Sequence, residues 1–304
     1  AYLLRGLYYR ENSRFDIALN DIHKSIELNP NYWKAYDALS QIYTWDAPDM
    51  VKALEYGHKA VNLHMGKDLI RLYRTLGFIY SCIYLFEEAK EYFNYSYELT
   101  GYNDSAIYFL QLGTLEQYQG NYKKADEYLQ KALKTNTSNP VLFRRLGGNY
   151  NLMEDYEKSL YYYKMFFKSK ETEDIFDLGE THRLAQAYYE TGNIQKAEEY
   201  FNKQINDCKN SIKKNRGFAQ SNRALYDLAV VYAFKGMKEE AYKNLDEFIK
   251  MDFIPLWWVN LAKDDPLMKS LREEQKFQDI IIEMESKFQK EQDRVKLWLE
   301  SNNP

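Results

Sequence analysis

The feature that most constrains the fold is a short pattern that recurs every 34 to 44 residues. It contains a Leu-Gly or Leu-Ala pair, a tyrosine three residues later, and an alanine-centred helix after a short turn. The clearest copies include Leu76-Gly77, Leu112-Gly113 and Leu146-Gly147. Such a period is typical of stacked helix pairs, each too small to bury its own apolar face. The pattern therefore predicts an all-α solenoid whose function is binding.

Seven helix pairs can be placed on the chain before the pattern ends near Pro255. Two joints are longer than the rest, at 171–180 and 207–221, where polar residues interrupt the apolar periodicity. Such insertions predict loops or helix extensions on one edge. The terminal unit has to close the open end of the core with a polar outer face. The predicted units are about 1–32, 33–67, 68–103, 104–138, 139–175, 176–218 and 219–254, followed by a C-terminal cap and amphipathic helix over 255–304.

Over about residues 1–254 the pattern resembles the tetratricopeptide repeat. The resemblance implies a right-handed superhelical solenoid of about seven helix pairs, in which small residues lie where two antiparallel helices approach closely. In the first helices these small residues are Gly6, Ser40, Gly77, Gly113, Gly147, Ala185 and Ala229. In the second helices they are Ala18, Ala53, Ala89, Ala125, Ala197 and Ala241, with Ser159 as an exception.

Larger residues lie four positions after the small residue of the second helix, and we expect them to lock one unit onto the next. Burying each of them stabilises the fold by roughly 1.5 to 3 kcal/mol. Gly57 breaks this rule in the second unit. The residues concerned are Ile22, Phe93, Leu129, Tyr163, Phe201 and Leu245.

Both ends of the chain carry a narrower resemblance. The opening residues 1–9 and the closing residues 261–268 are similar to those of repeat arrays attached to bacterial nucleotide cyclases and winged-helix regulators. The tail has Lys276 where such arrays usually have arginine. The resemblance implies a regulatory part of a larger bacterial signalling protein. Because the chain starts with Ala1 and Tyr2–Tyr9 already look like a first helix, we expect further sequence or a removed leader upstream.

Composition narrows the class of partner and the compartment. The net charge of −4 and pI near 5.8 argue against a surface devoted to nucleic acid, for which a pI above about 9 is usual. The basic stretch 209–216 has four positive charges and no stacking aromatic residue. Cys82 and Cys208 lack disulfide or CxxC spacing, which indicates neutral thiols in a reducing, cytoplasmic compartment. No apolar run reaches the 18 to 20 residues that a membrane span needs.

Catalytic and metal motifs are missing from the sequence. Gly66-Lys67 lacks the remainder of a phosphate-binding loop, and no GxSxG motif occurs. His23, His58, His64 and His182 form no HExxH or i,i+4 pair, so shared metal ligation is not expected. We therefore predict a protein that is not an enzyme and that binds no cofactor and no metal.

In tetratricopeptide arrays the first helix of each pair lines a concave groove, so the resemblance places candidate binding residues there. Arginine can bind a carboxylate or phosphate by two parallel hydrogen bonds and can stack on aromatic rings. The groove would therefore suit an extended acidic or aromatic peptide. In the alternative, the arginines pair with neighbouring acids or lie in water. The candidates are Lys34, Gln41, Arg71, Arg74, Phe78, Tyr118, Arg144, Asn151, His182, Gln186, Tyr189, Arg223 and Tyr226, with Asp37, Leu110, Thr114, Leu152 and Phe234 on the same faces.

Of three other functions, one is disfavoured and two remain open. Leu3 and Leu7 stand where chaperone co-factors need a Lys and Asn pair, which argues against that role. The array could be a sensory or autoinhibitory module that acts on an upstream cyclase or DNA-binding domain of its own polypeptide. It could also self-associate through Trp257, Trp258 and Trp298, unless these residues cap the last helix pair.

Overall fold

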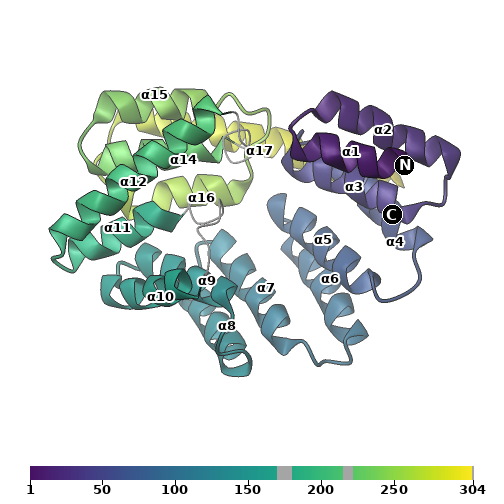
Figure 1. Ribbon diagram of the computed structural model, residues 1–304, viewed down its shortest axis with the longest axis horizontal. Coiled ribbons are helices and arrows are strands. Elements are labelled where there is room, and N and C mark those ends of the chain that lie inside the picture. Colours follow the sequence, from purple (N-terminus) through teal and green to yellow (C-terminus); the bar gives the residue numbers. More distant parts are fainter. Residues whose placement is uncertain (170–179, 215–221, 303–304) are drawn as a thin grey trace. The chain divides into compact units, whose positions relative to one another are not determined.

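The computed structural model describes residues 1–169, 180–214 and 222–302, and every regular element in these ranges is helical (Figure 1). Consecutive helices pack against each other as pairs. The prediction of an all-α fold built from helix pairs is therefore confirmed. Of the two long joints, 171–179 and 215–221 lie outside the described residues. The part from 207 to 213 extends a helix, which is one of the two predicted outcomes.

The chain divides into two compact units, and unit 1 comprises residues 1–104 and 286–304. Three helix pairs and the second part of the long C-terminal helix, α17 (Gln275–Asn302), form this unit. The pairs are α1 (Tyr2–Glu11) with α2 (Phe15–Leu28), α3 (Trp33–Trp45) with α4 (Met50–Leu63), and α5 (Leu69–Cys82) with α6 (Phe86–Leu99).

Unit 2 comprises residues 105–285. Four pairs and the C-terminal elements of the unit lie within it. The pairs are α7 (Ser105–Tyr118) with α8 (Tyr122–Thr135), α9 (Pro140–Leu152) with α10 (Tyr156–Lys168), α11 (Thr181–Glu190) with α12 (Ile194–Lys213), and α14 (Arg223–Phe234) with α15 (Lys238–Phe248). They are followed by α16 (Leu256–Asp264), the 3-10 turn η2 (Pro266–Met268) and the first part of α17.

The small residues allow the two helices of a pair to approach closely. A Cβ atom on Gly77 would lie 2.4 Å from Cε1 of Phe93, in the second helix of the same pair. The large residue thus packs first against the glycine of its own pair. The second pair reverses the arrangement, since Ser40 replaces glycine and a Cβ on Gly57 would lie 3.1 Å from its Oγ. The sequence exception at Gly57 therefore makes room for Ser40 and for Leu76, whose Cδ2 would be 2.8 Å away.

We expect Gly77→Ala to lower the free energy of unfolding by about 1–2 kcal/mol, because overpacking outweighs the helix preference of alanine. Gly148→Ala is a matched control, since Gly148 is also helical and the added Cβ would meet only the Tyr163 hydroxyl, at 3.3 Å. Urea denaturation of both variants checks this. Equal stability of the two variants would show that the close approach at Gly77 is not constraining.

Stacked tyrosines explain the tyrosine of the recurring pattern. In four pairs, the tyrosine three residues after the small residue of the first helix stacks on a tyrosine three residues after the small residue of the second. Offset stacking of such rings contributes about 0.5–1.5 kcal/mol beyond their burial. The ring pairs are Tyr43 and Tyr56, Tyr80 and Tyr92, Tyr150 and Tyr162, and Tyr188 and Tyr200, with centroids 5.8, 5.3, 5.6 and 5.6 Å apart.

A lysine just before the small residue of the second helix adds a contact to the same stacks. The ammonium of Lys158 lies 4.8 Å from the ring centroid of Tyr150, and that of Lys196 lies 5.4 Å from that of Tyr188. In the fourth pair Glu116 replaces the tyrosine, and the corresponding Lys124 forms an ion pair with it at 2.7 Å. The same two positions of the repeat are therefore in contact in different helix pairs, whichever residues occupy them.

Two of the three tryptophans considered for self-association belong to the packing of unit 2. The Trp258 ring lies 4.5 Å from that of Tyr226 and 5.2 Å from that of Phe248, and it is 7% exposed. Trp257 stacks on Tyr118 at 5.4 Å. These contacts favour the alternative in which Trp257 and Trp258 cap the last helix pair.

Candidate binding site

In unit 1, the candidate arginines already bind carboxylates. Arg71 donates two hydrogen bonds of 3.0 Å to the two oxygens of Asp37. Arg74 donates to Asp104 at 2.7 Å and to Ser96 Oγ at 2.9 Å. In unit 1 the arginines therefore pair with neighbouring acids, as in the alternative stated for the sequence.

The other candidates of unit 1 also contact each other or their neighbours. Gln41 donates to Asp37 at 3.0 Å and accepts from Arg10 at 3.2 Å. Phe78 stacks on Trp45 with ring centroids 4.6 Å apart, and the Lys34 ammonium lies 5.5 Å from the ring centroid of Trp33. The predicted groove residues of unit 1 thus make polar and aromatic contacts with other residues of the same unit.

In unit 2, four of the predicted groove residues are buried. Asn151, His182, Gln186 and Tyr226 are each at most 1% exposed. These four side chains therefore do not lie on an accessible surface. For Tyr226 the reason is the C-terminal segment of the unit, because η2 packs on α14 and Asp265 accepts a hydrogen bond of 3.5 Å from the Tyr226 hydroxyl.

A buried ion pair joins α11 to this segment, and sequence reasoning missed it. The Arg183 guanidinium donates to Asp265 at 2.7 Å and to Asn151 at 3.1 Å. The Arg183 side chain is 7% exposed and that of Asp265 is fully buried. Each residue lies in a recognisable part of the sequence, since Asp265 belongs to the tail motif and Arg183 comes two residues before Ala185. No sequence pattern indicates that the two side chains meet.

Two of the remaining candidates of unit 2, Arg144 and Arg223, meet at one carboxylate. Glu180, directly before α11, accepts a hydrogen bond of 2.8 Å from the Tyr163 hydroxyl. Arg144 from α9 lies 3.5 Å from Glu180 Oε1, and Arg223 from α14 lies 3.6 Å from the same atom. Their side chains are 27% and 35% exposed. Two half-buried guanidiniums therefore share one carboxylate oxygen.

Arg145 adds a third guanidinium beside an aromatic ring. It lies 6.0 Å from the ring centroid of Tyr118, and no ion pair links it to an acid in the described parts of the chain. We call Arg144, Arg145 and Arg223, with Glu180, the arginine cluster. Sequence reasoning found Arg144, Arg223 and Tyr118 and missed Arg145.

The charges in the arginine cluster repel one another. Burial lowers the pKa of Arg144, and the charges of Arg145 and Arg223 lower it further against the opposing effect of Glu180. An approaching anion stabilises a guanidinium in such a position, because it lowers the free energy of the charged form. The cluster therefore favours an anionic ligand.

A second carboxyl group, that of Asp227, lies within electrostatic reach of Arg223. Asp227, in α14, is 2% exposed, and burial raises its pKa to about 8. Its carboxyl accepts a hydrogen bond of 3.4 Å from Gln204, which also donates to Cys208 Sγ at 3.1 Å. At neutral pH the Asp227 carboxyl is therefore mostly protonated. His182 lies nearby, and burial holds its pKa well below the usual value.

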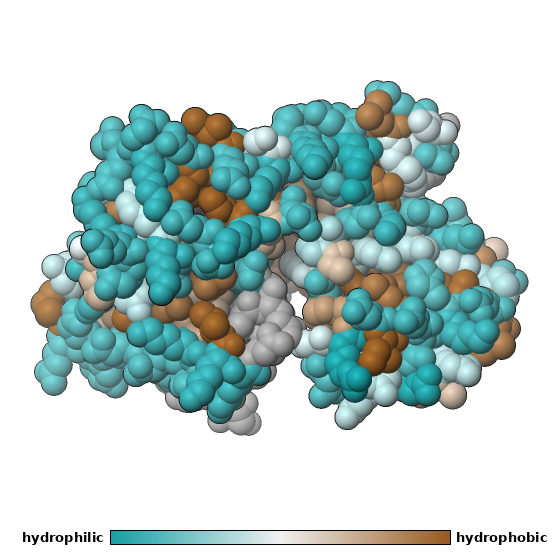
Figure 2. All heavy atoms as spheres, turned by 90° about the horizontal axis from the view of Figure 1, so that it is seen from above, coloured by the Kyte–Doolittle hydropathy of each residue, from teal (hydrophilic) through white to brown (hydrophobic). Residues whose placement is uncertain are grey.

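The described residues were also searched for other kinds of site. No three His, Cys, Asp or Glu side chains among them lie close enough together to bind a metal ion. None of their helices combines the length and apolar character of a membrane span. On the face shown in Figure 2, apolar residues form scattered groups between hydrophilic ones.

Two segments of the chain, 106–139 and 182–206, match the tetratricopeptide repeat family. They correspond to the pair α7/α8 and to most of α11 and α12. The fold is a tetratricopeptide solenoid. No curated protein sequence matches the chain significantly.

Solved structures with similar helix arrangements are tetratricopeptide solenoids of low sequence identity. The Rap conjugation gene regulator of plasmid pLS20, in complex with a peptide, is 14% identical over 88% of this chain and 76% of its own, with a TM-score of 0.67. The Cut9–Hcn1 tetramer of the APC/C is 16% identical over 93% and 48%, with 0.56. The type IV pilus biogenesis factor PilW is 21% identical over 66% and 90%, with 0.52. At these identities the likeness concerns the fold alone.

Proposed function

We propose that this tetratricopeptide solenoid is a non-catalytic scaffold that binds an acidic segment of a partner protein at the arginine cluster of unit 2. The observation that carries the proposal is Arg145, whose guanidinium has no ion pair with an acid in the described residues and whose positive charge acts on the half-buried Arg144 beside it. Solenoids of this repeat generally offer extended surfaces for other proteins.

The chemistry of the arginine cluster suits a carboxylate. An incoming carboxylate would accept hydrogen bonds from Arg144 or Arg145 and would reduce the repulsion between them. The Tyr118 ring is 8% exposed and stacks on Trp257, so it supports the Arg145 guanidinium by a cation–π contact. The partially exposed guanidiniums contribute less than buried ones would, because water screens them.

We expect Arg145→Glu to weaken binding of an acidic, tyrosine-containing peptide by at least about tenfold. The change replaces the attraction between the guanidinium and the peptide carboxylates by repulsion between two negative charges. Fluorescence anisotropy of a labelled peptide of alternating glutamate and tyrosine measures this. Lys123→Glu is the matched control, since Lys123 is exposed on α8 and the change in net charge is the same.

The peptide should also dissociate as salt is raised from 50 mM to 500 mM, because ions screen partly exposed charges. If Arg145→Glu and Lys123→Glu weakened binding equally, the arginine cluster would not be the binding site.

The sequence prediction of a regulatory role in a larger bacterial signalling protein stays a prediction. An acidic segment of a longer form of the same polypeptide would fit the arginine cluster by the same chemistry. Arg144→Glu in such a longer polypeptide would then change its cyclase or DNA-binding output. An unchanged output would count against regulation within one polypeptide.

A further inference from the structure

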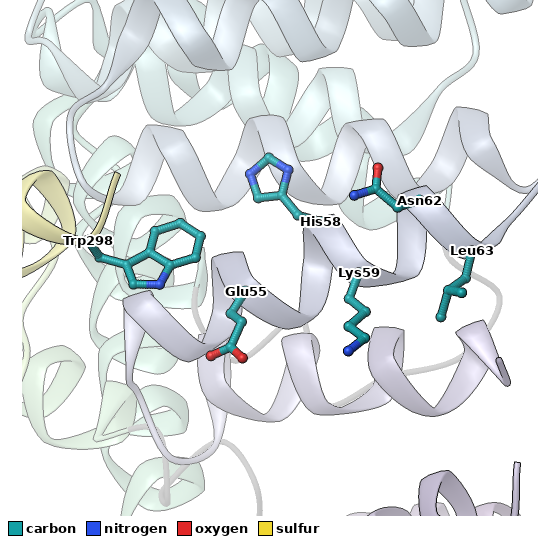
Figure 3. Close-up of a pocket in the computed structure, with 6 residues that line it drawn as sticks. All are labelled: Glu55, His58, Lys59, Asn62, Leu63 and Trp298. Atoms are coloured by element: carbon teal, nitrogen blue, oxygen red, sulfur yellow. The ribbon is translucent and has the colours of Figure 1, made fainter. Parts of the chain in front are cut away.

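Unit 1 contains a pocket of about 280 Å³, and no residue of the arginine cluster lines it. Five of its lining residues follow one face of α4, from Glu55 at one end to Leu63 at the other, and Trp298 of α17 closes the end next to Glu55 (Figure 3). His58, Lys59 and Asn62 lie between these ends. This volume lies at the lower end of the range for ligand pockets, about 300–1,000 Å³, and leaves room for one long side chain.

The wall formed by Trp298 is held in place by the second part of α17. Glu291 Oε1 accepts a hydrogen bond of 2.7 Å from the backbone N–H of Met50, at the start of α4. Arg294 forms an ion pair with Asp49, the residue that precedes Met50. Gln292 donates to the carbonyl oxygen of Ile83 at 2.9 Å. These three contacts anchor α17 between one and two turns before Trp298, so the indole is part of a built site.

The floor of the pocket carries no charge at neutral pH. His58 is 8% exposed, and burial lowers its pKa to about 4. Its Nε2 lies 2.9 Å from the Tyr80 hydroxyl and its Nδ1 lies 3.5 Å from that of Tyr92. The indole of Trp298 lies 6.5 Å from the imidazole ring centroid. The floor and one end are therefore aromatic and neutral.

The two charged residues of the pocket differ in their partners. The Lys59 ammonium lies 5.3 Å from the ring centroid of Tyr36, so an aromatic ring already faces it. Glu55 is exposed, and its carboxylate has no hydrogen bond or ion pair with the described part of the chain. Figure 3 shows this carboxylate at the Trp298 end. An unpaired anion beside an indole favours a cation and disfavours an anion.

We propose that this pocket binds the cationic side chain of an arginine or lysine in a partner protein. The apolar stem of that side chain would pack along α4 between Leu63 and Trp298, and its charged end would meet the Glu55 carboxylate and the indole. This site is independent of the arginine cluster, which selects the opposite charge. A partner that used both would carry separate acidic and basic segments.

The test uses small probes of matched length on the whole chain. Nα-acetyl-lysine methylamide and its arginine analogue carry the charge, whereas the norleucine analogue has a neutral apolar side chain. The reporter is the indole N–H signal of Trp298 in NMR spectra, assigned from its loss in Trp298→Phe. We expect the lysine and arginine probes to shift it at millimolar concentration and the norleucine probe to bind about tenfold more weakly.

Two variants separate the charge from the ring. Glu55→Gln should weaken binding of the lysine probe about three- to fivefold, and Trp298→Leu should weaken it by a similar factor. For Trp298→Leu, the shift of the Tyr80 ring signals serves as the reporter. Glu127→Gln is the matched control, since Glu127 follows Ala125 on α8 as Glu55 follows Ala53 on α4.

The proposal is overturned if the norleucine probe binds as tightly as the lysine probe, if Glu55→Gln has no more effect than Glu127→Gln, or if no probe moves the Trp298 signal. Because Arg145→Glu should leave this titration unchanged, failure here and failure of the arginine cluster are distinguishable.

Discussion

An Asp265→Ala variant should lose about 3–5 kcal/mol of unfolding free energy, because the change leaves the Arg183 guanidinium buried without its carboxylate. Asp265 also accepts a hydrogen bond of 3.0 Å from the backbone N–H of Leu267, at the start of η2. Both groups would be left unsatisfied in the same place. Urea denaturation followed by circular dichroism measures the loss.

The neighbouring aspartate provides the control for this prediction. Asp264 is exposed and accepts one hydrogen bond, of 2.6 Å, from the Tyr122 hydroxyl. Its replacement by alanine should cost about 0.5–1.5 kcal/mol. The double variant Arg183→Met and Asp265→Ala should be more stable than Asp265→Ala alone, since no charge is then left buried. If Asp265→Ala cost no more than Asp264→Ala, the buried ion pair would not hold unit 2 together.

Asp227→Asn should become progressively more stable than the unchanged protein as the pH rises from about 4 to 8. In the folded state the pKa of Asp227 is raised to about 8, whereas an unfolded aspartate has a pKa near 3.9. Between these values the unfolded chain releases a proton that the folded chain keeps. The stability of the unchanged protein therefore falls by up to about 1.4 kcal/mol per pH unit.

His182 acts in the opposite direction below its unfolded pKa of about 6.5. Burial holds the folded-state pKa of His182 well below that value, so stability is lost as the pH falls and the unfolded chain takes up a proton. Between about pH 4 and 6.5 the two residues offset each other. The decline due to Asp227 should therefore emerge in the unchanged protein only between about pH 6.5 and 8.

The difference between Asp227→Asn and the unchanged protein isolates the carboxyl group, because His182 contributes equally to both. Asparagine also keeps an oxygen that can accept the hydrogen bond from Gln204. Urea denaturation at half-unit steps of pH gives the difference curve, and the infrared carboxyl band of Asp227 gives its titration directly. A flat difference curve from pH 4 to 8 would contradict a raised pKa.

The helix pairs could be predicted because their contacts are local in sequence. A small residue and a large one at fixed spacing, as in Gly77 and Phe93, determine how two neighbouring helices meet. The candidate site was harder, because its geometry depends on residues far along the chain. Asp265 contacts Arg183 from 82 residues away, and no local pattern relates them.

Exposure also differs among the predicted groove residues of unit 2. First-helix positions at Arg144 and Arg223 stay half-exposed in unit 2. Tyr226 and His182, which correspond to Arg144 in the repeat, are buried, and at Tyr226 the cause is the packing of η2 on α14. A resemblance to a repeat supplies the average environment of a position, and the cap makes the last pairs depart from it.

The tyrosine stacks give each of four helix pairs its own optical reporter. Two aromatic rings at 5.3–5.8 Å are close enough for their electronic transitions to couple, so each stack adds a signed band to the circular dichroism spectrum. In a solenoid, stability is nearly a sum over neighbouring repeats. A Tyr→Phe change in one stack at a time would therefore assign each band to its pair, and heating would then show the order in which the pairs separate.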